Sequence, residues 1–179
     1  MTETHQTETD HVDAFLEELD GPEIDLTVEG IVDRIMGLSR RLRRSMDEAL
    51  ERVDLSWEEW RLICALRNQG EPYRLSPGEL AHKQELSTGA MTNRLDRLEK
   101  AGLVRRLPNP DDRRSLLVEL TDDGKRLWDD FVEVQAAKEA LITSAALDEA
   151  EREQLNAYLR RLMIAFERSE AAPGRRAHL

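Results

Sequence analysis

Side chains that form strong hydrogen bonds are concentrated between residues 87 and 97 of this sequence. They alternate with an apolar stripe of Met91, Leu95 and Leu98, so that a helix would place the polar and apolar groups on different faces. Hydroxyl, amide and guanidinium groups bind phosphates and the edges of DNA bases, with Asn suited to adenine and Arg to guanine. The candidates for such contacts are Ser87, Thr88, Gly89, Thr92, Asn93 and Arg97.

Two helices and a hairpin are predicted to position these residues. The first helix opens with Ser76-Pro77-Gly78-Glu79, the pattern of a capping box with Pro in the first turn. The second runs from Ser87 to Gly102. Strand-like runs at 103–107 and 116–120 then flank a loop rich in Pro, Asn and Asp, which suits a hairpin tip. This order is the outline of a winged helix-turn-helix, and a short run before it, 73–75, is expected to add a third strand.

Long helices are predicted on both sides of this core. Apolar residues recur at helical spacing over 27–53 and again over 122–168, where Asp148 is expected to cap the last helix. Because so small a core cannot cover this surface, we expect a homodimer and a fold that is mainly α with a small β-wing. The expected segments are an acidic extension (1–26), an N-terminal dimerisation helix (27–55), a winged helix-turn-helix DNA-binding domain (56–121), C-terminal dimerisation helices (122–168) and a flexible tail (169–179).

The acidic extension has two interpretations. Up to about residue 9 its composition is that of a disordered segment. Val12, Phe15, Leu16 and Leu19 nevertheless have the spacing of a short amphipathic helix. The segment is therefore either a solvated tail or an extra helix that packs on the dimer or on a ligand pocket.

The distribution of charge matters more than its sum. The chain of 179 residues has a net charge of −11, but the first 29 residues contain ten acids and no Lys or Arg, so the rest carries only −1. Residues 88–114 hold seven basic and four acidic side chains, a local excess that would attract a phosphate backbone. No apolar run is long enough to cross a bilayer and no secretory signal is present, so we expect a cytoplasmic protein without membrane contact.

The sequence contains few features that indicate an enzyme. There is no Gly-rich phosphate loop and no His-Glu-x-x-His motif. The single cysteine, Cys64, lies among apolar residues and is expected in the core. The histidines are scattered and match no standard metal site, so we predict no catalytic residue, cofactor or metal. They are His5, His11, His82 and His178.

Together these elements resemble the MarR family of bacterial transcription regulators. The resemblance is carried by residues 75–81, 86–104 and above all 111–124, where Asp-Asp-Arg-Arg-Ser precedes Val-Glu-Leu-Thr-Asp-Asp-Gly. It extends from about residue 31 to residue 166. It implies a homodimer with intertwined terminal helices, in which the second helix of the motif enters the major groove of double-stranded DNA.

The resemblance also implies a role for the hairpin tip. By position, Arg114 is the wing arginine that enters the minor groove, and Asp112 is the carboxylate that orients its guanidinium. A flat, permanently charged and weakly hydrated guanidinium suits a narrow, electronegative A·T-rich minor groove. Two copies related by a two-fold axis would read a palindromic operator with half-sites about 10 bp apart.

Within the family, the run Trp57-Glu58-Glu59-Trp60 and the N-terminal extension resemble the urate-responsive and PecS-like branch. That branch builds its ligand pocket from a Trp on the extra helix, an Asp and two Args. Arg94 and Arg106 match the two arginines, whereas Arg61 stands at the Asp position and the extension has no Trp. If the three arginines converge, they favour a small anionic or aromatic-acid effector over urate. In the alternative, Arg61 is exposed and Arg94 pairs with a nearby acid.

Each candidate residue also has an ordinary explanation, as part of a solvated helix face, a strand edge or a loop ion pair. Their occurrence in the order helix, turn, helix and wing favours DNA binding over these explanations. We therefore predict a sequence-specific DNA-binding transcriptional regulator, with repression as the expected mode. The alternative is a winged-helix module that contacts only other proteins.

Overall fold

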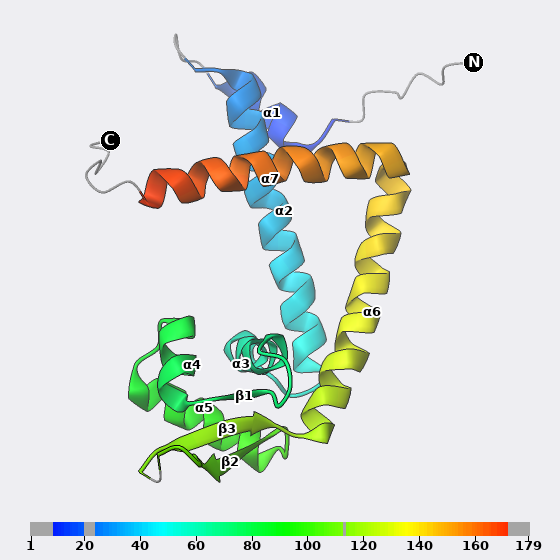
Figure 1. Ribbon diagram of the computed structural model, residues 1–179. Helices are drawn as coiled ribbons and strands as arrows, with labels where there is room; N and C mark the ends of the chain where they lie inside the picture. The colour runs from blue at the N-terminus through cyan, green and yellow to red at the C-terminus, as the bar shows by residue number, and fades with distance from the viewer. Residues whose placement is uncertain (1–8, 20–23, 113, 172–179) are drawn as a thin grey trace. The chain divides into compact units, whose positions relative to one another are not determined.

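The computed structural model describes residues 9–19, 24–112 and 114–171 (Figure 1). The predicted disordered N-terminal stretch, His5, His178 and most of the predicted tail lie outside these residues. The elements are α1 (His11–Glu18), α2 (Leu26–Glu51), α3 (Trp57–Asn68), β1 (Arg74–Leu75), α4 (Pro77–Gln84), α5 (Thr88–Lys100), β2 (Val104–Pro108), β3 (Leu116–Leu120), α6 (Asp122–Ala146) and α7 (Glu149–Ala171). The predicted fold, mainly α with a small β-wing, is confirmed.

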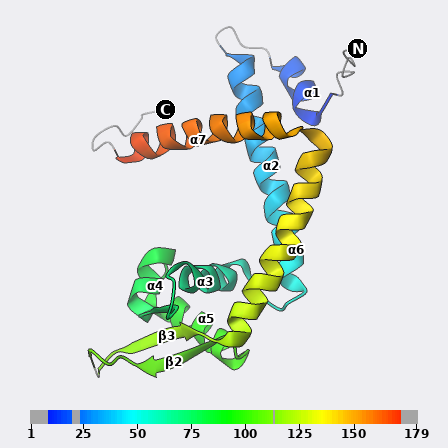
Figure 2. The same ribbon diagram turned by 45° about the vertical axis from the view of Figure 1, so that its right-hand side comes forward.

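Contacts divide the chain into two compact units, residues 1–124 and 125–179. In the first unit, α3, α4 and α5 pack with a three-stranded antiparallel sheet of order β1-β3-β2 (Figures 1 and 2). In the register of the strands, Arg74 of β1 and Arg105 of β2 both lie opposite the same residue of β3, Glu119. The predicted third strand at residues 73–75 is thus confirmed as β1.

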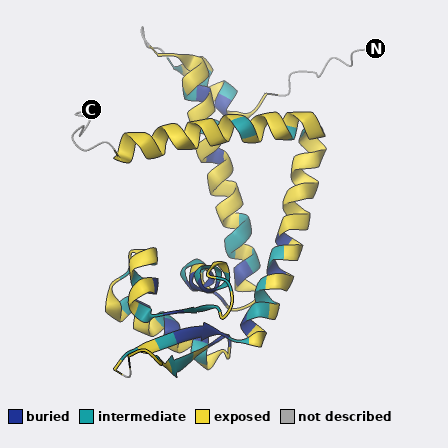
Figure 3. Cartoon of the chain, viewed as in Figure 1, coloured by how far each residue is buried: buried dark blue, intermediate teal, exposed yellow. Residues whose placement is uncertain are grey.

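The buried residues of this winged domain lie on its helices and on its sheet (Figure 3), and most of them are apolar. The predicted stripe of the second helix, Met91, Leu95 and Leu98, is buried. Cys64, predicted to be core, is only partly buried. The remaining buried apolar residues of the domain include Leu55, Trp60, Leu62, Ile63, Leu66, Leu75, Leu80, Leu103, Val104, Val118 and Leu120.

Side-chain caps begin the three helices of the winged domain, and at α4 and α5 they lie where the sequence predicts. At α3 the Ser56 hydroxyl accepts from the Glu59 N–H while the Glu59 carboxylate accepts from the Ser56 N–H, and Ser76 and Glu79 form the same capping box at α4. Each box satisfies two backbone donors that a helix N-terminus leaves unpaired. Ser87 caps α5 through the N–H of Ala90. These caps fix the first turn of α3 and of both helices of the helix-turn-helix.

The helix predicted over 27–55 ends earlier than expected, at Glu51. Asp54 adopts a left-handed conformation with φ of 54°, and the N–H of Leu55 donates back to the carbonyl of Leu50. This turn satisfies carbonyls at the helix end and lets Leu55 enter the core. The sequence did not reveal it because the residue at the turn is Asp rather than Gly.

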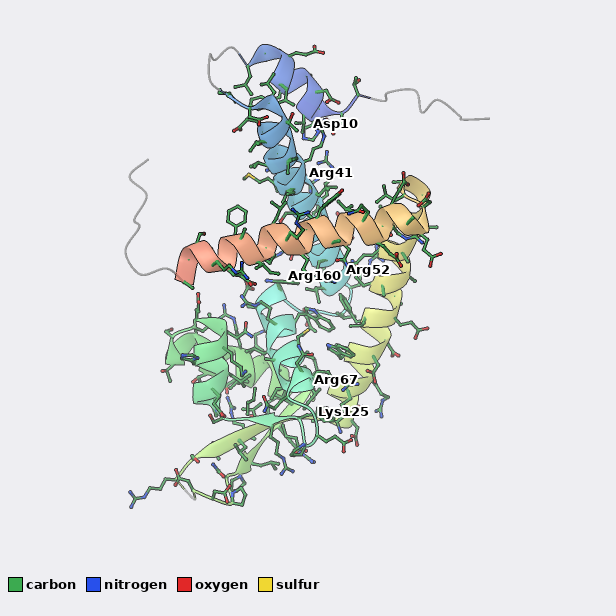
Figure 4. All side chains as sticks on the ribbon, turned by 45° about the horizontal axis from the view of Figure 1, so that its top comes forward. Asp10, Arg41, Arg52, Arg67, Lys125 and Arg160 are labelled. Atoms are coloured by element: carbon green, nitrogen blue, oxygen red, sulfur yellow. The ribbon has the colours of Figure 1, made fainter. Side chains whose placement is uncertain are left out.

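The N-terminal extension contains an ordered helix, α1, which packs on α2 (Figure 4). Asp10 caps α1 and, together with Asp13, forms an ion pair with Arg34 of α2. Val12 is buried, whereas Phe15 is half exposed. The expected short helix is therefore present in the part that the structure describes, and its packing on the dimer or on a ligand pocket stays a prediction.

The second unit is a pair of long helices, most of α6 followed by α7. Asp148 forms a capping box with Glu151 at the start of α7, as predicted. None of the residues of α7 is buried, and its apolar side chains include Tyr158 at 51% and Phe166 at 64% exposure (Figure 3). No helix in the described part of the chain is long and apolar enough to span a bilayer.

A buried carboxylate crosslinks the three strands. Glu119 of β3 accepts from Arg74 of β1 and from Arg105 of β2, and only 9% of its side chain is exposed. Burial raises the pKa of Glu119, but hydrogen bonds and charges from Arg74 and Arg105 outweigh it, so the pKa lies below its ordinary value. The ionised form therefore stabilises the sheet.

This pairing predicts a pH-dependent stability. A lowered pKa in the folded state gives a contribution that is complete above the unfolded value, near 4.5, and is lost as the pH falls through the folded value. At pH 7 we expect Glu119→Gln to lower the free energy of unfolding by about 1–3 kcal/mol. Urea unfolding at several pH values checks this, with the exposed Glu48→Gln as control. A difference from wild type that persists unchanged at pH 3 would contradict it.

Candidate nucleic-acid interface

The predicted reading face of α5 is exposed. Gly89, Asn93 and the first residue of the helix, Thr88, all face solvent. The Thr92 hydroxyl donates to the Thr88 carbonyl at 3.0 Å, so its proton is engaged within the helix while its oxygen can still accept. Helix α5 and the hairpin lie together at one end of the first unit, with α1 at the other (Figures 1 and 2). The N-terminal half of α5 thus offers hydroxyl, amide and backbone N–H groups beside the wing.

Arg97, predicted to reach a base, is not a free cation. Its Nε lies 2.8 Å from Oε1 of Glu59 on α3. The Glu59 side chain is 3% exposed, whereas that of Arg97 is 65% exposed. The guanidinium is therefore held at its inner edge and open to solvent elsewhere. A pocket of about 380 Å³ borders this ion pair and is lined by Asp54, Leu55, Glu59, Arg97, Leu98, Lys100 and Ala101.

The wing loop is shaped by local hydrogen bonds. The Asp112 carboxylate accepts from the backbone N–H of Arg114 at 3.0 Å, and the Ser115 N–H donates to the Asp112 carbonyl. Asn109 likewise accepts from the N–H of Asp111 and donates to the Ser115 hydroxyl. Arg114 is exposed at this tip. Asp112 acts here on the backbone of Arg114, and the predicted contact with the guanidinium stays a prediction.

The three arginines predicted to hold a ligand have different surroundings. Arg61 is exposed, and Arg94 donates to the Ala90 carbonyl of its own helix at 3.2 Å. Arg106 on β2 forms ion pairs of 2.7 Å with both Asp96 and Glu99 of α5. Burial lowers the pKa of Arg106, but these carboxylates more than compensate and raise it.

An anion that bound Arg106 would have to displace one of those two carboxylates. Arg61 and Arg94, by contrast, have no carboxylate partner among the described residues. The exposed position of Arg61 fits the ordinary alternative, whereas the predicted ion pair of Arg94 with an acid is absent from the described residues.

Comparison with known proteins decides the family. Residues 55–116 match the MarR family profile. The chain is also 33% identical over 141 residues to the HTH-type transcriptional regulator PecS of Dickeya dadantii, a match that covers 79% of this chain and 84% of PecS. The chain belongs to the MarR family.

Solved MarR-family structures share the fold. Wild-type MarR from E. coli superposes with a TM-score of 0.63 at 26% identity, covering 79% of this chain and 98% of that structure. The protein RV1404 from Mycobacterium tuberculosis gives a TM-score of 0.63 at 28% identity over 87% of this chain and its full length. This MarR-family chain is a DNA-binding transcriptional regulator, as the sequence predicted. In this fold α5 is the second helix of the helix-turn-helix and the β2–β3 hairpin is the wing.

Three acids at this interface were not identified from the sequence as functional. They are Glu59, which contributes to the family resemblance only within the run 57–60, and Asp96 and Glu99, two of the four acids between residues 88 and 114. A signal for Glu59 did exist. It lies four residues before Ile63 and seven before Leu66, on the apolar stripe of its helix, and a buried acid at such a position requires a cation.

Proposed function

We propose that this MarR-family regulator binds a palindromic operator as a homodimer and represses transcription. In this proposal α5 lies in the major groove, with Ser87, Thr88, Gly89, Thr92, Asn93 and Arg97 as contacts, and Arg114, with Asp112 beside it, lies in the minor groove. The observation that carries the proposal is the exposed polar face of α5 beside a wing whose tip presents Arg114. The helix can recognise base edges in the major groove, and the wing arginine can recognise the shape of the minor groove.

The homodimer is supported by apolar surface that one chain leaves uncovered. On α2, Leu38 is 59% and Leu42 53% exposed, and α7 exposes Met163 at 61%. Exposed apolar residues that recur along each of these helices indicate a protein interface, and a two-fold symmetric one is the commonest solution. Other exposed apolar residues of these helices include Val28, Ile31, Ile35, Tyr158, Leu159, Leu162 and Phe166.

The test is binding of the purified protein to DNA from its own upstream region, titrated with salt and compared with DNA of shuffled sequence. Tight, selective binding that falls steeply with salt is expected, because each neutralised phosphate releases counterions. Analytical ultracentrifugation of the complex should give two chains per operator. Weak binding that does not distinguish the two DNAs would favour the winged-helix protein-interaction module instead.

We further propose a small anionic or aromatic-acid effector that releases the protein from DNA. Arg94 and Arg61 support it, since both carry charge without a carboxylate partner in the described residues, and Arg106 supports it if the effector displaces Asp96 or Glu99. Arg94 lies on the recognition helix, so a ligand that binds it would favour one placement of α5 over another. Release would then follow as a shift between two populations.

This proposal predicts that Arg94→Ala raises the effector concentration needed for release by roughly 10-fold or more, the value of one charged hydrogen bond. Operator affinity in the absence of effector should stay the same. Displacement of labelled operator by a panel of aromatic and polycarboxylic acids measures both quantities, with Arg40→Ala on α2 as control. An intact effector response in Arg94→Ala would exclude this pocket.

A further inference from the structure

Glu59 connects the cap of one helix to the reading face of another. Its Oε2 accepts from the N–H and from the hydroxyl of Ser56, each at 2.8 Å, which fixes the carboxylate at the start of α3. Its other oxygen, Oε1, lies 2.8 Å from Nε of Arg97 on the recognition helix. Both oxygens of a buried acid are thus engaged, one within α3 and one across to α5.

The same capping box occurs a second time without this connection. Glu79 accepts from the N–H and the hydroxyl of Ser76, each at 2.7 Å. Unlike Glu59, however, Glu79 is exposed to solvent. No ion pair joins Glu79 to a cation in the part of the chain that the structure describes. Capping α3 therefore does not require Glu59 to be buried against an arginine, and the pair with Arg97 needs a separate explanation.

The ion pair changes what Arg97 can bind. A guanidinium with a buried carboxylate behind it carries little net charge toward the outside, so it attracts phosphate less than a free arginine does. A phosphate bound there would also place a second anion close to Glu59. A guanine edge is neutral and offers two acceptors, O6 and N7, that match the flat donor array of arginine. Arg97 remains 65% exposed and available for such a contact.

We propose that Glu59 is a positioning residue that makes Arg97 a reader of guanine rather than of phosphate, at one base pair in each half-site. The inference rests on the proposed operator binding. Beyond operator binding, it assigns part of the sequence specificity at this base pair to Glu59 on α3, a residue that does not itself contact DNA.

The experiment measures the affinity of the full-length protein for its operator and for operators in which each G·C pair of both half-sites is replaced. The affinity of the wild-type protein should fall roughly 5- to 150-fold when the base pair that Arg97 reads is replaced. Arg97→Ala should abolish the discrimination at that pair alone. Arg97→Lys, which keeps the charge but not the flat donor array, should do the same.

Glu59→Gln is the decisive variant, because Gln can still close the capping box but leaves the charge of Arg97 unbalanced. We expect the discrimination at the base pair that Arg97 reads to fall several-fold. Binding to shuffled DNA should rise, with a salt dependence steeper by about one unit per subunit, because Arg97 would then contact phosphate. Adding Glu59→Gln to Arg97→Ala should change nothing further at that pair. Glu79→Gln, the matched cap variant, should leave selectivity and salt dependence unchanged.

The outcomes separate this inference from the proposed function. If wild type shows no selective binding, operator recognition itself fails. If Arg97→Ala weakens all operators equally, or if Glu59→Gln lowers affinity while discrimination stays intact, operator binding stands and the positioning role is wrong. Thermal unfolding of each variant is measured in parallel. If Glu59→Gln does not fold, Glu59→Asp replaces it, since the shorter side chain cannot hold both Ser56 and Arg97, and the same two outcomes apply.

Discussion

Arg114→Ala is expected to weaken operator binding by at least roughly 30-fold. Loss of a specific arginine contact costs about 1–3 kcal/mol, and a dimer bound to a palindrome loses two of them. Arg114 is exposed at a wing tip whose backbone is fixed by Asp112, so its removal leaves the loop and the core unchanged. Affinity measured at several salt concentrations checks this, and the salt dependence should become shallower.

Two further variants define what Arg114 contributes. Arg114→Lys keeps the charge, so binding to shuffled DNA should be preserved while the preference for A·T-rich flanking sequence falls, because ammonium is more strongly hydrated than guanidinium. Arg44→Ala removes an exposed charge on α2 and should have little effect. Binding of Arg114→Ala equal to that of wild type would exclude the wing from the interface.

Gly124→Ala is expected to destabilise the protein by about 3 kcal/mol, within the range measured when a packed site is overfilled. A Cβ at Gly124 would lie 2.2 Å from the carbonyl oxygen of Leu103 and 2.7 Å from Cδ1 of Leu120. The Leu103 oxygen cannot retreat easily, because it accepts from both the N–H and the hydroxyl of Thr121. The Thr121 hydroxyl also accepts from the N–H of Gly124. The start of α6 is therefore fixed against the end of α5 and β3.

Thermal unfolding at a fixed protein concentration measures this effect. A loss of 3 kcal/mol should lower Tm by roughly 6–12 °C in a chain of this size. Gly78→Ala is the control, because a Cβ there meets only the Ser76 hydroxyl, at 3.9 Å, inside a helix that favours Ala over Gly. A Tm for Gly124→Ala equal to that of Gly78→Ala would contradict this prediction, because it would show that the backbone at Leu103 moves away from the added Cβ without loss of stability.

The elements of the fold could be predicted because their signals are local. Ser76 and Glu79 mark a helix start within four residues, and the spacing of Met91, Leu95 and Leu98 marks a buried face within two turns. Asp148 marks the start of α7 in the same way. Misplaced boundaries arose where the backbone conformation was unusual, as at Asp54, whose left-handed turn ends α2 before the predicted position.

The polar residues of α5 and of the wing could be proposed as DNA contacts from the sequence, because order along the chain suffices to define helix, turn, helix and wing. Their contacts with DNA stay a prediction. By itself, then, the sequence determined most of the secondary structure and the resemblance to the family, and it supplied the candidates for contact with DNA. The partners of the charged side chains were decided only by the tertiary structure. Arg97 and Glu59 are 38 positions apart, and Arg74 and Glu119 are 45 apart. Charge pairs at such separations depend on how helices and strands pack, and no spacing along the chain encodes them.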